Sequence, residues 1–107
     1  MSESLKQAAE HLLAEVEREL RRQDLWESAP PAVDKVQSSE PFAADTLHLT
    51  QWLQWIFIPR MWALIEAQAP LPGNCNIAPY AELVFAELEE DTDRLQRLIQ
   101  AVDDLLG

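Results

Sequence analysis

The side chains that could carry out chemistry are few in this sequence, and their spacing forms no catalytic or metal-binding pattern. His11 and His48 stand apart from any recognisable arrangement of a nucleophile, a base and an orienting acid. Together with Cys75 they lack the paired spacing of metal ligands. The two glycines, Gly73 and Gly107, cannot form a phosphate-binding loop, because such loops need clustered glycines. We therefore expect a protein that is not an enzyme and holds no metal or other cofactor.

The acidic side chains between residues 87 and 93 form the densest group that could attract a cation. Calcium loops of the helix–loop–helix type place a glycine at the turn and close with a glutamate at the last position. Neither residue stands at the required spacing here. We therefore interpret the run as a solvated junction between two helices. Its members are Glu87, Glu89, Glu90, Asp91 and Asp93.

Arg60 is the most informative charged residue, because it lies in the most apolar part of the chain. No other lysine or arginine occurs between Lys35 and Arg94. A guanidinium buried in such a segment needs a partner, and Asp45 or Glu82 could supply the carboxylate. Alternatively, Arg60 forms part of a binding surface. The sequence leaves both interpretations open.

The tryptophans are the second unusual feature. Their large apolar area is typical of a core, yet a chain of 107 residues has little interior in which to bury four of them. A groove that binds a partner is therefore the alternative to the core. The tryptophans are Trp26, Trp52, Trp55 and Trp62.

The net charge of −11 limits the partners that the chain can approach. Its densest basic cluster, Arg18, Arg21 and Arg22, is interleaved with glutamates, so we expect no direct nucleic-acid binding. The lone cysteine is typical of a reducing compartment, and the acidic start of the chain is unlike a signal peptide. The apolar runs are too short for a membrane span. We therefore expect a cytoplasmic protein without a membrane segment.

Helical periodicity begins near the start of the chain. Ser4 and Gln7 form a capping pattern, and apolar residues then recur at spacings of three and four. This pattern predicts a helix over 4–23, with 1–3 as a frayed end. The opposite face of this helix carries its charges and should face water.

The prolines that follow predict a connector over 27–41 without regular structure. Structureless connectors of this length are uncommon in small domains and either have a function or lie across the core. Trp26 and Phe42, at its two ends, are expected to hold it down. The connector is therefore expected to contact the apolar centre of the fold.

The second helix should begin after Asp45 or Thr46, either of which could cap it. Its central segment, 47–69, is apolar nearly all round, which predicts that neighbours cover it from several sides. Pro59 cannot donate a backbone hydrogen bond and clashes with the carbonyl of Trp55. The helix should therefore be kinked or broken at Pro59.

Two more helices follow a firm stop. Proline is favoured at a first helical position, so the third helix should begin near Pro79. The fourth runs over 92–106, capped by Asp91 or Thr92. No strand pattern occurs in the chain. The sequence thus predicts an all-α fold, a small four-helix bundle that forms a single domain over 1–107.

Short motifs in order along residues 40–83 are the most specific feature of the sequence. In order and spacing they resemble the YqcC-like family of small bacterial proteins, and the WLQW and IPRM stretches are the most distinctive. The resemblance implies an all-helical, cytoplasmic bundle from a Gram-negative bacterium. It also implies a partner, because members of that family are often encoded beside a tRNA pseudouridine synthase. The motifs are Pro41-Phe42, Asp45-Thr46-Leu47, Trp52-Leu53-Gln54-Trp55-Ile56, Ile58-Pro59-Arg60-Met61, Leu71-Pro72-Gly73 and Ala78-Pro79-Tyr80.

The leading hypothesis is therefore a non-enzymatic protein-interaction domain, an accessory partner of a tRNA pseudouridine synthase. The alternative is a small-molecule binding module with a tryptophan-lined pocket between helices. Neither hypothesis needs a metal or a cofactor. The expected binding surface consists of Phe42, Asp45, Trp52, Trp55, Pro59, Arg60, Pro72 and Tyr80.

Overall fold

A computed structural model describes residues 3–107 of the protein, and the side chains from residue 4 on. The fold is all-α, as the sequence predicted. Within this range there is no strand. The elements in chain order are α1 (Glu3–Arg22), α2 (Val33–Val36), the 3-10 turn η1 (Pro41–Ala43), α3 (Leu49–Trp52), the π turn η2 (Leu53–Phe57), α4 (Ile58–Glu66), α5 (Ala78–Phe85) and α6 (Asp93–Leu106). Because α3, η2 and α4 follow one another without a gap, they form one continuous rod. The rod, α1, α5 and α6 correspond to the predicted helices.

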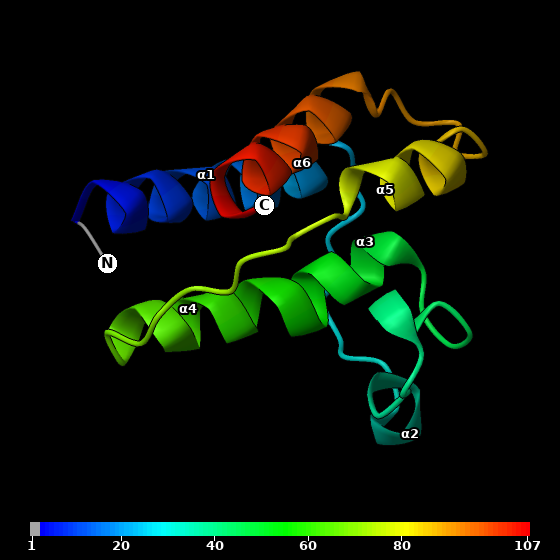
Figure 1. Cartoon of the computed structure of the whole chain (residues 1–107). Coiled ribbons are helices and arrows are strands. Elements are labelled where there is room, and N and C mark those ends of the chain that lie inside the picture. Colours follow the sequence, from blue (N-terminus) through cyan, green and yellow to red (C-terminus); the bar gives the residue numbers. More distant parts are fainter. Residues whose placement is uncertain (1–2) are drawn as a thin grey trace.

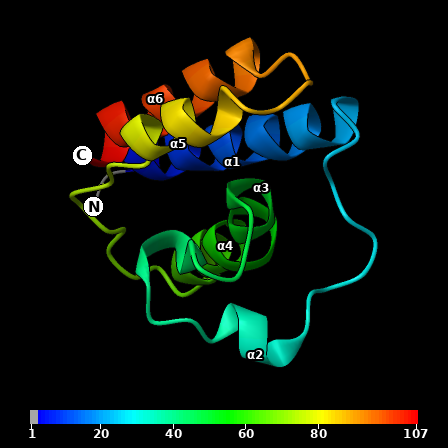
Figure 2. The same cartoon turned by 90° about the vertical axis from the view of Figure 1, so that its right-hand side faces the viewer.

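The helices enclose the core between two layers (Figure 1). In Figure 1 and in the perpendicular view of Figure 2, α1, α5 and α6 lie together on one side and the rod runs beneath them. The short helix α2 lies on the far side of the rod. The connector that leaves α1 therefore wraps around the rod before the chain enters it.

The layer of α1 and α6 supplies one side of the core. The two helices lie side by side, and their buried residues recur at spacings of three and four, which keeps them on one face. The prediction of two amphipathic helices at the ends of the chain is confirmed. The buried residues are Ala9, Leu13, Val16 and Leu20 on α1, and Leu95, Ile99, Val102 and Leu106 on α6.

The rod supplies the other side of the core, and its geometry is adjusted at η2. Its core residues follow at a constant spacing of four: Leu49, Leu53, Phe57, Met61 and Ile65. In a regular α-helix each such step turns the side chain by about 40° around the axis. At η2, however, the N–H of Ile58 bonds to the carbonyl of Leu53, five residues back. This wider turn reduces the rotation of successive core side chains around the rod axis. All five residues therefore stay in the core.

Pro59 explains the position of this wide turn. Its nitrogen carries no hydrogen and cannot bond to the carbonyl of Trp55, so the regular ladder is interrupted just before it. The irregularity that the sequence predicted at Pro59 is thus present, as a π turn. The prediction that neighbours cover the segment 47–69 from several sides holds over 49–58, where no residue is exposed, but it is wrong along one face of α4. Pro59, Arg60, Ala63 and Glu66 are exposed on one face of α4.

The end of α1 directs the chain toward the rod. The N–H of Leu25 bonds to the carbonyl of Leu20 at 2.8 Å, and the N–H of Asp24 bonds to that of Arg21 at 3.1 Å. Asp24 has a φ of 61°, so the helix ends in a Schellman motif with a left-handed residue. The motif turns the following residues across the rod. The same motif ends α4 at Gln68.

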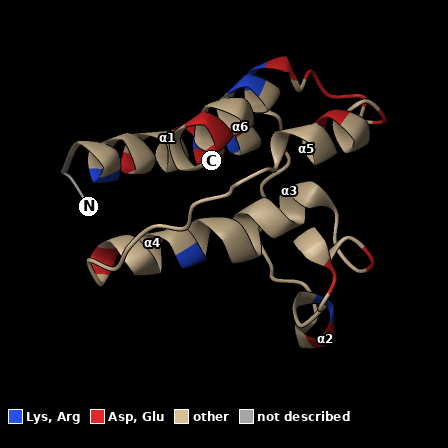
Figure 3. Cartoon of the chain, in the orientation of Figure 1, with Lys and Arg blue, Asp and Glu red and all other residues tan. Residues whose placement is uncertain are grey.

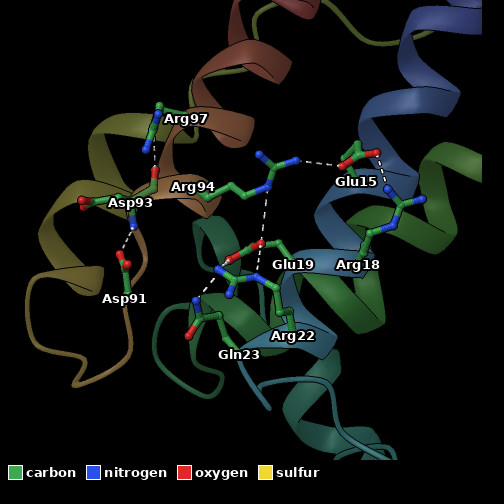
Figure 4. A network of polar contacts seen from close by, with 9 residues as sticks. All are labelled: Glu15, Arg18, Glu19, Arg22, Gln23, Asp91, Asp93, Arg94 and Arg97. Carbon is green, nitrogen blue, oxygen red and sulfur yellow. Dashed lines mark hydrogen bonds and ion pairs between the residues drawn. The ribbon is translucent and has the colours of Figure 1, made fainter.

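A polar network links α1 to α6 (Figure 4). Glu19 accepts hydrogen bonds from Arg22 at 2.7 and 3.0 Å and from Gln23 at 3.1 Å, and Arg94 of α6 binds Glu15 at 3.1 Å. Glu19 is only 2% exposed. Its pKa is lowered mainly by the hydrogen bond from Arg22, against the effect of burial. The expectation that the charged face of this helix meets only water is therefore wrong at Glu19.

Three local predictions also need correction. The connector 27–41 is not without regular structure, because α2 and the start of η1 lie within it. The rod begins after His48, whose N–H donates to the side chain of Gln51 at 2.8 Å, and Asp45 and Thr46 lie too early to cap it. The expected frayed segment falls, at residues 1–2, outside the described residues, and α1 already includes the third residue.

Candidate interaction surface

Three of the expected site residues meet in an aromatic stack. Phe42 of η1 lies parallel to Tyr80 of α5, with ring centroids 4.9 Å apart and an angle of 5° between the rings. The rings of Trp52 and Phe42 are nearly perpendicular, at 87° and with centroids 5.1 Å apart. Trp52 in turn stacks on the buried Phe57, with centroids 5.3 Å apart. Such pairs add about 0.5–1.5 kcal/mol beyond their burial. The stack therefore joins η1, the rod and α5.

Phe42 holds its place in this stack at a conformational cost. Its backbone is left-handed, with φ 60° and ψ 14°, and Ala43 follows with φ 51°. A residue with a side chain pays about 1–2 kcal/mol for this conformation. The N–H of Ala43 donates to the carbonyl of Glu40 at 2.9 Å, and the N–H of Ala44 donates to the carbonyl of Pro41 at 3.1 Å. These two bonds close the turn. Backbone strain of this kind is concentrated at functional sites.

Glu27, which the sequence did not single out, connects the long connector to the rod. Its N–H donates to Oε1 of Gln54 at 2.8 Å, and its carbonyl accepts from Nε2 of Gln54 at 2.7 Å. Its carboxylate accepts from the indole of Trp55 at 3.0 Å and from Gln51 at 3.1 Å. These partners lie 24 to 28 residues along the chain, so no local pattern could have revealed them. Glu27 is fixed in both backbone and side chain.

An open groove on one side of Glu27 contains most of the tryptophans. We call it the tryptophan groove; its volume is about 650 Å³. Of its charged lining residues, Arg21 lies over the ring of Trp26 at 4.7 Å and pairs with Glu17 at 3.0 Å. Trp52 belongs to the aromatic stack instead, and Trp26, Trp52 and Trp62 all pack against the core. The apolar lining consists of Trp26, Trp55, Ile58, Pro59 and Trp62.

A second open groove lies on the other side and shares Trp26 and Glu27 with the first. We call it the acidic groove; its volume is about 610 Å³. It lies between the end of α1, the start of the rod and α5 with the turn after it. Its apolar lining includes Leu25, Tyr80, Val84 and Leu88. Its acids are Asp24, Glu27, Glu87 and Glu90.

The proposed pairing of Arg60 with Asp45 or Glu82 is wrong. Arg60 is exposed, and its guanidinium makes no hydrogen bond or ion pair with any residue from 4 to 107. Its apolar neighbours in sequence belong to other faces of the helix, and position 60 lies on the face that α4 turns to solvent. Asp45 instead accepts a hydrogen bond from Ser38. The role of Arg60 in a binding surface stays a prediction.

The expected site residues are thus distributed over several features. Phe42, Trp52 and Tyr80 form the aromatic stack, while Trp55 and Pro59 line the tryptophan groove. Asp45 fastens the connector, and Arg60 is exposed on α4. Pro72 is exposed in the α4–α5 connector and lines neither groove.

Besides the two open grooves, the described residues contain one small space in the core. Among the side chains described, those of residues 4–107, no group of three or more could hold a metal ion. A space in the core, between Leu13 and Met61, measures only about 10 Å³, which is room for about one water. No helix in the described range is long and apolar enough to cross a bilayer. The arrangement is suited to contacts along open grooves.

Several proteins are similar to this chain along most of its length. A protein from Haemophilus influenzae, named only as uncharacterized, is 40% identical over 93 residues, which is 87% of this chain and 83% of that protein. The protein YqcC of Escherichia coli K12 is 38% identical over 87 residues, 81% of this chain and 75% of YqcC. The solution NMR structure of E. coli YqcC superposes with a TM-score of 0.81, at 29% identity, over 95% of this chain and 87% of that one.

One further relative is much longer. A protein of Pectobacterium carotovorum, named tRNA pseudouridine synthase C, is 43% identical over 62 residues. The match covers 58% of this chain but only 16% of that protein. Residues 8–105 match the sequence model of the family DUF446, which carries the description tRNA pseudouridine synthase C. With this match and the similarity to YqcC in sequence and in fold, the chain belongs to the DUF446 family of YqcC-like proteins.

Proposed function

We propose that the chain is a non-enzymatic interaction domain whose partner is a tRNA pseudouridine synthase. The observation that carries the proposal is the Pectobacterium protein, which includes a segment resembling this chain within a much longer polypeptide named tRNA pseudouridine synthase C. Joining two units in one polypeptide raises their effective concentration for each other. Where the small unit is a separate chain, it can associate with the synthase only through a surface that binds the enzyme.

The surface around Glu27 supports a protein partner. It presents half-buried tryptophans and a tyrosine beside open grooves, and aromatic residues and arginine are enriched at the centres of protein interfaces. The hydrogen bonds that Glu27 makes with Gln54 and Trp55 order the residues between the grooves. A surface that is already ordered loses little entropy on binding.

The charge supports an enzyme that works on RNA as the partner. Enzymes that bind RNA need positive surfaces, which neutralise phosphates. A chain with a net charge of −11 is attracted to such a surface and repelled by the RNA itself. The chain would thus contact the enzyme directly.

The tryptophan groove also favours the second candidate, a small-molecule binding module. Its volume of about 650 Å³ lies within the range of ligand sites, about 300–1,000 Å³. It is an open groove, however, and ligand pockets bury most of their ligand. We therefore place the protein partner first.

The test measures binding of the purified chain to the synthase of the same organism and, separately, to bare tRNA, at low and at physiological ionic strength. We expect the chain to bind the enzyme at about micromolar concentrations or tighter, with slower association at the higher salt. Tight binding to bare tRNA, or no binding to the enzyme at either salt, contradicts the proposal.

Arg60 gives the same test a residue-level readout. Because its guanidinium has no partner within residues 3–107, Arg60→Ala should leave the melting temperature unchanged. If Arg60 belongs to the binding surface, the substitution weakens the complex. The matched control is Arg97→Ala, which removes an exposed side chain of the same charge from α6. Equal weakening by both variants would show only an effect of net charge.

A further inference from the structure

The acidic groove carries charge of one sign on an apolar floor. Four carboxylates line it, and no lysine or arginine does. Figure 3 shows acidic residues along the connector that leads from α5 to α6, and Glu87 and Glu90 of this connector line the groove. The tryptophan groove differs, because Arg21 there neutralises Glu17. The negative electrostatic potential of these carboxylates favours a cationic partner.

Most of these carboxylates have no basic partner within the chain. Asp24, Glu87 and Glu90 form no ion pair with any residue from 3 to 107. In contrast, Glu15 and Glu19 are paired with arginines of α1 and α6. A cation bound in the groove is therefore attracted by carboxylates that no lysine or arginine of the described chain already pairs with.

The remaining carboxylate, that of Glu27, is held in place by uncharged donors. The indole of Trp55 and the amide of Gln51 fix its oxygens, and Gln54 fixes its backbone. Its charge is oriented but not neutralised. A guanidinium or ammonium that pairs with it need not order it first.

The floor of the groove calls for an apolar contact in addition to the charge. Leu25 and Val84 are half-buried there, and Leu88, in the turn after α5, is 36% exposed. Interfaces gain most of their energy where apolar side chains fill such depressions. RNA offers neither an apolar side chain nor a positive charge. The combination therefore points to protein.

We propose that the acidic groove binds a basic segment of the partner protein, one that places an arginine or lysine against Glu27 and an apolar side chain on the floor. This proposal rests on the proposed function and adds to it the place and the chemistry of the contact. The segment must combine both features, because acidic and apolar side chains line the groove together.

A synthetic probe tests the groove without the synthase. The probe is a short peptide in which arginine alternates with leucine, and its counterpart carries glutamate in place of arginine. We expect the arginine peptide to shift the methyl NMR signals of Leu25, Val84 and Leu88. The glutamate peptide should leave them unchanged. Shifts confined to the tryptophan groove, or no shifts at all, overturn the proposal.

Matched variants separate the groove from net charge. Glu87→Gln with Glu90→Gln removes two charges from the groove, and Glu66→Gln with Asp104→Asn removes two exposed charges elsewhere. The groove pair should weaken binding of the arginine peptide by about three- to tenfold, and the control pair by less than about twofold. Leu88→Ser should also weaken binding, whereas Leu83→Ser should not, although Leu83 is more exposed at 73%. The proposal is overturned if the groove double variant and the control double variant weaken binding equally, and if Leu88→Ser and Leu83→Ser do so as well.

The same variants are then tested against the synthase. If the wild-type chain does not bind the synthase while the peptide results hold, the proposed partner is wrong and the groove specificity stands. If the wild-type chain binds and the groove variants bind equally well, the groove proposal is wrong and the proposed function stands.

Discussion

The side-chain amide of Gln54 binds both backbone polar groups of Glu27, accepting from its N–H at 2.8 Å and donating to its carbonyl at 2.7 Å. Gln54 is 4% exposed, so a buried side chain here replaces the backbone pairing that a connector lacks. The contact fastens the residues after α1 to the rod. It thereby sets the boundary between the two grooves.

Replacing Gln54 by leucine should destabilise the protein by about 1–3 kcal/mol. Leucine keeps the approximate volume but leaves the N–H and carbonyl of Glu27 without their partner. Urea unfolding measures the change, and Gln100→Leu on the exposed face of α6 is the control. An unchanged midpoint for Gln54→Leu would mean that water or another group satisfies Glu27.

The relationship between Gln54 and Glu27 also shows where sequence reasoning ends. Local periodicity located α1 and α6, because spacings of three and four place apolar side chains on one face. Glu27 meets its partners across 24 to 28 residues, a separation on which local patterns carry no information. The tertiary fold alone brings them together.

Three other differences between the sequence analysis and the structure have local causes. Arg60 has apolar neighbours in sequence, but neighbours in sequence point to different sides of a helix, and its own side is exposed. Pro59 indicated a lost hydrogen bond but not how the rod would adapt, since a kink, a break and a π turn all accommodate it. The four residues of α2, within a proline-rich connector, gave no periodic pattern to detect.

Gln68→Gly should stabilise the protein by about 0.5–1 kcal/mol. Gln68 has a φ of 55° at the end of α4, where the N–H of Ala69 closes the terminal motif on Leu64 at 2.9 Å. Glycine adopts this conformation without the steric cost of a side chain. Thermal unfolding measures the gain. The control Ala63→Gly, in the interior of α4, should have the opposite sign; a loss of stability in both variants would contradict the argument.

Glu19 should contribute to the loss of stability in acid. Its pKa is lowered, first by the hydrogen bond from Arg22, so its stabilising effect is present above the ordinary value of about 4.5. The effect is lost as the pH falls through the lower pKa of the folded state. Glu19→Gln should therefore flatten the decline of stability as the pH falls below about 4.5, measured by urea unfolding at several pH values. Glu66→Gln, an exposed control, should leave the slope as in the wild type.

Cys75 should react as a thiol of raised pKa. Burial is the main cause, and the charge of Asp103 adds to it. Alkylation of the folded chain should therefore reach half of its maximal rate at a higher pH than alkylation of the chain in urea. The associated stabilisation is present below the ordinary thiol pKa and is lost as the pH rises through the folded value. Mass spectrometry of iodoacetamide labelling measures both profiles, and coincident midpoints would refute the shift.

Asp103 of α6 caps the start of α5 from outside that helix. Its carboxylate accepts from the N–H of Ile77 at 2.9 Å and from that of Ala78 at 2.7 Å, and it is 8% exposed. A helix start leaves such N–H groups unpaired and carries positive partial charge, so a carboxylate suits it on both grounds. Because Tyr80 follows within the first turn of α5, the same contact positions the aromatic stack on Phe42.

Asp103→Asn should therefore cost about 1–3 kcal/mol, since an amide offers one acceptor where the carboxylate offers two. Asp104→Asn, on the exposed side of the same turn, should cost less than about 0.5 kcal/mol and serves as the control. Urea unfolding gives the free energies, and amide hydrogen exchange at Ile77 and Ala78 reports the cap itself. Equal costs for the two variants, with unchanged exchange at Ile77 and Ala78, would show that α5 does not depend on Asp103. Loosened capping should instead speed exchange first at these two amides, because they lose their acceptor directly while the core of α6 stays packed.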